Sequence, residues 1–258
     1  MTVILEERVS GAALFARRLS VFSFVVFVLS AFGLQRRLMD TPEFIVLLGL
    51  VLALALLALL AALWGWRRVW SFGDRGGGNL AIAILFSVIV LSPFVVAGIF
   101  FVIEPPISDV STDLGDPPTF LAAKKTRTAQ MNPIRPISAE EAKLQSAAFP
   151  AVSGRRYGAS IDHVLEIVRQ TIKAEGWRIS SGPPLGEDQT EYEIEAVART
   201  PLLPFPSDVV VRLRDEGDST YVDMRSASRY GRFDLGSNAA RIRDFLARLD
   251  VAMASEAR

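Results

Sequence analysis

Residues 44–63 read FIVLLGLVLALALLALLAAL, a run without one charged side chain. Two further apolar runs accompany it, near residues 19–34 and 80–103. A helix of about 20 apolar residues crosses a hydrocarbon layer about 30 Å thick and satisfies its backbone N–H and C=O groups within itself. The sequence therefore predicts a transmembrane anchor over residues 1–103, built as a bundle of three helical spans.

Positive charges are distributed unevenly around the three runs. Six arginines precede the first run or lie between the second and the third, namely Arg8, Arg17, Arg18, Arg67, Arg68 and Arg75. Only Arg36 and Arg37 lie between the first and the second. Because cytoplasmic loops carry the excess of Lys and Arg, this pattern predicts a cytoplasmic N-terminus. It indicates a bacterial inner-membrane protein of several spans with a periplasmic C-terminal domain.

The first run also has features of an export signal, because it is short and follows Arg17 and Arg18. No small-x-small cleavage site follows it, and Gln35 to Arg37 is typical of a helix end, so we expect an uncleaved span. No ionisable residue interrupts any of the three runs, which disfavours transport of ions or protons. An anchoring role is the simpler interpretation.

The remainder of the chain divides into a tether and a domain. Residues 104–155 are rich in proline, serine, threonine and charge, which predicts an extended tether. Within it, Ser138 and Glu141 have the spacing of a capping box and predict a short helix over residues 140–147. Residues 156–258 show regular periodicity and predict a soluble α+β domain.

Helical and strand periods alternate in that domain. Apolar residues at helical spacing are Ile161, Val164, Leu165, Val168 and Ile172, and near the C-terminus Ile242, Phe245, Leu246 and Leu249. Period-two patterns follow Trp177, Glu191 and Val209, and a hairpin turn at residues 215–218 leads into a further strand. We expect an antiparallel sheet of about four to five strands packed against two helices, with Glu191, Glu193 and Glu195 on its open face.

Composition excludes several chemistries. The chain has no cysteine, which removes disulfides, thiolate nucleophiles and iron–sulfur ligation. A single histidine, His163, is too few for a histidine-based metal site, and its position indicates a solvated surface residue. Residues 105–258 carry 20 basic and 22 acidic side chains, so nucleic acid is not an expected partner. We expect no cofactor and no catalytic residue.

Three carboxylates gather in residues 109–116. Asp109, Asp113 and Asp116 offer the oxygen ligands that Ca²⁺ and Mg²⁺ prefer. Their spacing differs from that of an EF-hand loop, and Asp near Gly or Pro caps turns through its own side chain. We expect turn capping or ion pairing and assign no metal site. A metal-assisted hydrolase that uses these carboxylates is the alternative function.

Residues 225–241 form a second polar segment, which leaves a predicted strand, crosses a Gly-bearing loop and opens a helix. Free N–H groups at a helix N-terminus favour an anion such as a phosphate, a lipid headgroup or a carboxylate. The other interpretation is internal pairing that clamps the tether to the domain. The residues proposed for either role are Arg225, Arg229, Arg232, Asp234, Asn238, Asp113 and Asp116.

The same two segments carry a family resemblance. The blocks, in order, are Ser111-Thr-Asp113, Asp116-Pro-Pro, Arg225-Ser-Ala-Ser-Arg229, Gly231-Arg232, Asp234-Leu-Gly236 and Asn238. Their order resembles the bacterial family known only as domain of unknown function fourteen-ninety-nine, over about residues 109–249. Ser207 and Phe233 depart from that pattern. The resemblance implies a fold and a membrane context, and it supplies no reaction.

These observations predict a membrane-anchored envelope protein that works as a binding or structural module and is not expected to be an enzyme. Its expected partners are the lipid bilayer and an anionic small molecule or lipid headgroup. The binding hypothesis depends on the arginine-rich loop at the start of the last helix, with the Asp residues orienting the guanidinium groups. The sequence leaves the ligand and the protein partners open.

Overall fold

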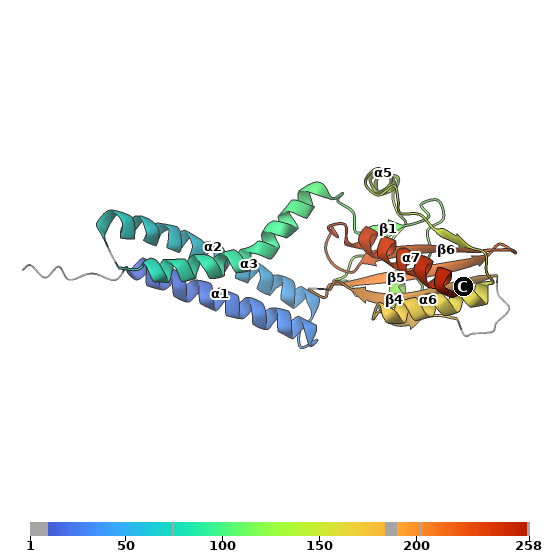
Figure 1. The fold of residues 1–258 in the computed structure, drawn as a ribbon, viewed down its shortest axis with the longest axis horizontal. Helices are drawn as coiled ribbons and strands as arrows, with labels where there is room; N and C mark the ends of the chain where they lie inside the picture. Colours follow the sequence, from blue (N-terminus) through green and yellow to red (C-terminus); the bar gives the residue numbers. More distant parts are fainter. Residues whose placement is uncertain (1–9, 74, 184–189, 202, 257–258) are drawn as a thin grey trace, which may run out of the picture. The chain divides into compact units, whose positions relative to one another are not determined.

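The computed structural model describes residues 10–73, 75–183, 190–201 and 203–256 (Figure 1). The chain divides into two compact units, Met1–Ile99 and Phe100–Arg258. We call the first the helical unit and the second the head domain. The family blocks found in the sequence all lie in the head domain.

The helical unit contains three long apolar helices. They are α1 (Gly11–Gln35), α2 (Thr41–Phe72) and α3 (Gly77–Ile103), the last turn of which belongs to the head domain. Each is long and apolar enough to cross a membrane. The predicted three apolar helices are confirmed, and each begins before or ends beyond its apolar run.

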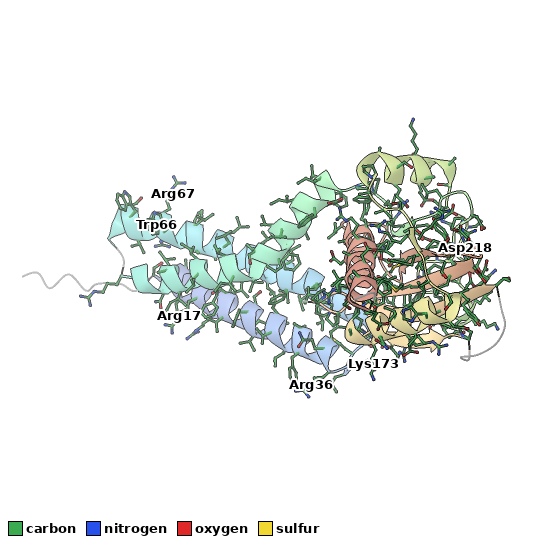
Figure 2. All side chains as sticks on the ribbon, turned by 45° about the vertical axis from the view of Figure 1, so that its right-hand side comes forward. Arg17, Arg36, Trp66, Arg67, Lys173 and Asp218 are labelled. Carbon is green, nitrogen blue, oxygen red and sulfur yellow. The ribbon has the colours of Figure 1, made fainter. Side chains whose placement is uncertain are left out.

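Small residues lie where these helices contact one another. Ala13, Ala62 and Ala83 are fully buried, and a Cβ atom on Gly65 would lie 2.9 Å from the Leu80 side chain. Small side chains let helix backbones approach closely, which is the usual way to pack helices in lipid. Figure 2 shows Trp66 and Arg67 at one end of the helical unit. The large apolar side chains mostly point outward, which suits an apolar surrounding.

The head domain is built on an antiparallel sheet of six strands. They are β1 (Asp109–Ser111), β2 (Arg155–Tyr157), β3 (Arg178–Ser181), β4 (Glu191–Arg199), β5 (Pro206–Asp215) and β6 (Thr220–Ser228). Their order is β1-β6-β5-β4-β3, and β2 also pairs with β6. The expected count of four to five was therefore too low. β1 and β2 have three residues each, too few to show a period of two.

Four helices accompany the sheet in the described residues of the head domain. They are α4 (Ala122–Thr126), α5 (Ala139–Ala148), α6 (Ile161–Ala174) and α7 (Ser237–Glu256). Figure 1 shows α6 and α7 side by side against the strands. Their apolar stripes bury Val168, Ile172, Phe245 and Leu246 against the sheet face that carries Val211. The predicted pair of helices on one face of an antiparallel sheet is confirmed.

The opposite face of the sheet is covered as well. Residues 112–136, which we call the strap, connect β1 to the segment before α5. Phe120 and Ala123 of the strap pack against Val210 of β5 and Ala227 of β6. The expectation that this face is open is wrong, because sequence periodicity cannot show which loop crosses a sheet. The segment predicted as a tether therefore contributes a strand, two helices and a cover to the head domain.

Candidate functional site

Ion pairs hold the strap on the polar face of the sheet. The Arg212 guanidinium on β5 contacts both carboxylate oxygens of Asp223 on β6, at 3.1 and 2.6 Å. It also donates to the Asp116 carboxylate at 3.0 Å and to the Asp116 carbonyl at 2.7 Å. Burial opposes the charge on Arg212, but Asp223 and Asp116 raise its pKa. Arg212 therefore joins two strands and the strap through one charged group.

Asp113 belongs to the same cluster. Its carboxylate lies 3.5 Å from Arg214 and accepts the backbone N–H groups of Gly115 and Asp116, both at 2.9 Å. Partial burial opposes its ionisation, yet these N–H groups and the two arginines lower the pKa of Asp113. Asp113 thus closes a turn through its own side chain, as its position near Gly115 predicts, and at the same time it faces a guanidinium group.

Arg225 clamps the start of the domain. Its guanidinium forms a bidentate pair with Asp109, at 2.9 and 2.8 Å, and only 6% of its side chain is exposed. It also donates to the carbonyls of Pro118 and Arg135. The donors of Arg225 that sequence analysis offered to a ligand are therefore used inside the protein. The pair links residues 116 positions apart in the chain.

Asp208 on β5 binds two arginines. Arg127 of the strap approaches it to 2.8 Å and Arg229 approaches it to 2.6 Å, and the Asp208 side chain is 2% exposed. Arg127 also donates to the carbonyls of Asn132 and Ala227. Sequence analysis missed this pair. Arg127 lies in a segment without periodicity, and Asp208 lies near the start of β5, directly before the apolar residues Val209 to Val211. The pairing of Arg229 with Asp208 was unpredicted for the same reason.

Glu195 on β4 performs a related task. Its carboxylate accepts the backbone N–H groups of Leu121, Ala122 and Ala123 at 2.7, 2.6 and 2.8 Å. These N–H groups belong to Leu121, the residue before α4, and to the first turn of α4, where no helical carbonyl can accept them. An acidic row that alternation assigned to solvent therefore includes a buried acceptor for the strap.

The start of α7 is occupied by the protein's own carboxylate. Asp234 accepts the backbone N–H groups of Gly236 and Asn238, at 3.0 and 2.8 Å. Burial raises the pKa of Asp234, against the effect of these N–H groups. Asn238 is fully buried and bonds Ser226 and the carbonyl of Ser108. The helix N-terminus that the anion hypothesis left for a ligand is already capped.

Asn132 holds the first part of the loop between β6 and α7. The Asn132 side chain donates to the carbonyls of Ser228 and Gly231 at 3.1 and 2.7 Å, and its backbone N–H donates to the carbonyl of Arg229. Gly231 has a positive φ of 84°, a conformation that glycine adopts without strain. The side chain that follows, Arg232, is therefore presented from a fixed backbone.

A half-open cleft with a volume of about 540 Å³ lies beside this loop. Pockets that bind small molecules typically have about 300–1,000 Å³. Its wall combines charged and apolar side chains, and includes Pro106, Asp109, Arg127, Arg135, Glu140, Glu141, Leu144, Arg232 and Phe233. The cleft lies entirely within the head domain.

Most charges in the cleft wall are already paired. Asp109 binds Arg225, Arg127 binds Asp208, and the Arg135–Glu141 pair is 2.6 Å long. In the part of the chain that the structure describes, the side chains of Arg232 and Glu140 make no hydrogen bond or ion pair. One cation and one anion of the wall therefore remain available to a bound group.

The predicted site residues are thus distributed over several separate places. Asp113 and Asp116 surround Arg212 and Arg214, while Arg225 and Arg229 bind other carboxylates. Asp234 and Asn238 cap and brace α7, and Arg232 faces the cleft. Asp113 and Asp116 share Arg212 and Arg214, whereas Asp109 binds Arg225, and the described residues contain no cluster of three ligands that could hold a metal ion. The hydrolase alternative lacks the convergence of carboxylates that it requires.

The head domain is a small α+β domain that follows three apolar helices in the chain. An ion-paired strap covers one face of its sheet, and two helices cover the other. Residues 109–249 match the family described as Protein of unknown function (DUF1499). Since the match covers more than half of the chain, the protein belongs to this family. The resemblance seen in the sequence is therefore confirmed.

Two other comparisons add no function. No curated protein matches the chain. One similar solved structure is the vertebrate conserved region of human METTL16, with 19% sequence identity over 42% of this chain and 87% of that chain. Its TM-score is 0.26, so the likeness carries no argument about fold or activity.

Proposed function

We propose that this protein is a membrane-anchored binding module of the bacterial envelope, and that its head domain binds a phosphate-type anion in the cleft at Arg232. The observation that carries the proposal is the Arg232 guanidinium, which lacks a partner among the described residues and lies in the wall of a cleft of ligand size. A guanidinium group offers paired donors that match phosphate and carboxylate oxygens.

The surrounding structure favours binding over a purely structural role for Arg232. Arg225 and Arg229, its neighbours in the sequence motif, are used for internal pairs with Asp109 and Asp208. Asn132 holds the carbonyls of Ser228 and Gly231, just before Arg232, so the backbone there needs little ordering when a ligand arrives. The arginine-rich motif thus combines two clamps with one arginine available for a ligand.

The anchor sets the expected location of this activity. α1, α2 and α3 have the length and composition of membrane spans. The excess of arginine before α1 and between α2 and α3 favours a cytoplasmic N-terminus. On this proposal, the head domain lies on the periplasmic side of the inner membrane, where its cleft meets envelope molecules.

Binding of inorganic phosphate to the full-length protein in a neutral detergent tests the proposal. Phosphate should raise the unfolding temperature of the wild type and should not raise that of Arg232→Ala, because a ligand that binds only the folded state stabilises it. Arg243→Ala is the matched control, since Arg243 is an exposed arginine on α7 outside the cleft wall. Equal phosphate responses in wild type and Arg232→Ala would overturn the proposal.

A further inference from the structure

We infer that the occupant of the cleft is a phospholipid with a phosphoethanolamine headgroup, its phosphate at Arg232 and its ammonium group at Glu140. This inference rests on the proposed function and names the ligand class. It starts from the two side chains of the cleft wall that have no partner in the described residues, one cation and one anion. A ligand that carries one negative and one positive group can contact both of these exposed side chains, whereas a simple anion would contact Arg232 alone.

The chemistry of the two groups restricts the ligand further. Arg232 suits a phosphate oxygen, because its guanidinium donates several hydrogen bonds and accepts none. Glu140 is an acceptor, and a primary ammonium group can donate hydrogen bonds to its carboxylate. A quaternary ammonium group has no N–H to donate. Glu140 therefore favours ethanolamine over choline at the same phosphate.

An apolar surface continues from the cleft along the chain. Phe233 lines the cleft beside Arg232, and its ring packs on Phe101 with centroids 4.5 Å apart. Phe101, Val102 and Ile103 form the last turn of α3 and are 53%, 84% and 69% exposed. In water such a patch would be unfavourable, but an acyl chain would cover it.

Chain geometry places the cleft close to the end of a candidate span. Pro106 lines the cleft and follows Ile103, the last residue of α3, by three positions. Three residues reach at most about 10 Å. A lipid in the leaflet at this end of α3 can thus keep its acyl chains beside the apolar turn while its headgroup enters the cleft. This continuity is the reason for choosing a lipid over a soluble phosphate compound.

Lipid retention by the full-length protein tests the inference. The protein is placed in nanodiscs that contain phosphatidylethanolamine, phosphatidylglycerol and phosphatidylcholine in equal amounts, and the lipids that stay bound after transfer to mild detergent are identified by native mass spectrometry. Wild type should retain phosphatidylethanolamine about tenfold over phosphatidylcholine, as one lost charge-assisted hydrogen bond implies. Arg232→Ala should lose this retention, and Arg243→Ala should keep it.

Two further variants separate the parts of the ligand. Glu140→Gln should abolish the preference for phosphatidylethanolamine, while inorganic phosphate should still raise its unfolding temperature because Arg232 is retained. Phe233→Ala should weaken lipid retention about tenfold while phosphate still raises its unfolding temperature, whereas Ile179→Ala, at an exposed apolar residue on β3, should change neither lipid retention nor the phosphate response. Equal retention by wild type and Phe233→Ala would overturn the lipid as the source of the headgroup.

The failures of the two proposals are distinguishable. A wild type that responds to phosphate through Arg232 but retains phosphatidylglycerol as well as phosphatidylethanolamine would overturn the phosphoethanolamine inference alone. An unchanged lipid preference in Glu140→Gln would do the same. If the wild type shows neither a phosphate response nor a lipid preference, the proposed function is overturned together with the inference.

Discussion

Arg212 shows at the scale of single residues how a polar sheet face can be buried. Its side chain is 5% exposed, and the carboxylate of Asp223 that it binds is fully buried. A buried charge without a partner is costly, and removing one member of such a pair typically costs about 3–5 kcal/mol. Asp223 and Asp116 use the donors of Arg212 from two sides. Asp116 therefore binds the strap to the sheet, because it accepts hydrogen bonds from the buried Arg212 guanidinium.

The Arg135–Glu141 pair at the rim of the cleft gives a prediction for pH dependence. The hydrogen bonds from Arg135 lower the pKa of Glu141 to about 2, against the effect of partial burial. Because the pKa in the folded state lies below the ordinary value of 4.5, the stabilisation is complete above that value and fades as the pH falls toward 2. Arg135 is 56% exposed, so solvent screening reduces the size of the effect.

We expect Glu141→Gln to lower the opening free energy of α5 by about 1 kcal/mol at neutral pH, and by less at about pH 3. Hydrogen exchange of the α5 amides in the full-length protein measures this free energy. Glu140→Gln is the control, because Glu140 lies in the same first turn and has no ion pair among the described residues. A loss that is equally large in both variants would assign the effect to the helix dipole.

At the scale of elements, α5 protects an edge of the sheet. Among the described strands β1 pairs only with β6, so no strand bonds the backbone groups on its other side. The Gln145 side chain fills this place: its oxygen accepts the Ser111 N–H at 3.1 Å and its amide donates to the Ser111 carbonyl at 2.6 Å. One glutamine therefore imitates the hydrogen bonding of a neighbouring strand.

Gln145→Ala should accordingly release β1. Both buried backbone groups of Ser111 would lose their partners, at a cost of about 1–3 kcal/mol. Exchange of the Ser111 amide hydrogen with solvent should become faster by a corresponding factor. Gln170→Ala is the comparison, since Gln170 bonds Glu166 on the exposed side of α6. Unchanged Ser111 exchange in Gln145→Ala would show that β6 alone holds the strand.

Periodicity explains which of these elements can be predicted. α6 and β4 follow their apolar spacing, and the capping box of Ser138 and Glu141 forms as its spacing predicts. The strap contacts have no such signal, because Arg225 and Asp109, or Arg127 and Asp208, are brought together only by the complete sheet. The arginine motif was therefore recognised from the sequence, while the division of its arginines between clamps and cleft required the structure.

At the scale of the whole molecule, the chain separates an apolar part from a neutral, highly charged one. Residues 1–104 carry eight basic and six acidic side chains, and residues 105–258 carry 20 and 22. In the head domain these charges neutralise one another internally, so the domain has no strong field to attract nucleic acid. The few positive charges of the first part matter instead by their order along the chain, because they set the expected orientation of the spans.

That orientation can be tested by labelling, because the natural chain has no cysteine. Single cysteines are introduced at Leu38 between α1 and α2, at Ser71 near the end of α2, and at Asp218 in the β5–β6 turn, all of which are exposed. A maleimide that cannot cross membranes should label Leu38→Cys and Asp218→Cys in intact spheroplasts. It should label Ser71→Cys only after the membrane is permeabilised, because the arginine-rich side of the spans is expected to face the cytoplasm.

The wild-type chain serves as the control without label, and labelling after denaturation shows that each cysteine is reactive. The reverse pattern, with Ser71→Cys alone labelled in intact spheroplasts, would place the head domain in the cytoplasm and the cleft among cytoplasmic anions. Equal labelling of all three positions without permeabilisation would show that α1, α2 and α3 do not separate two compartments. Six arginines lie on the expected cytoplasmic side of the spans and two lie on the other side. Replacing Arg67 and Arg68 by Asn leaves four against two, so the preference for one orientation should become weaker without reversing.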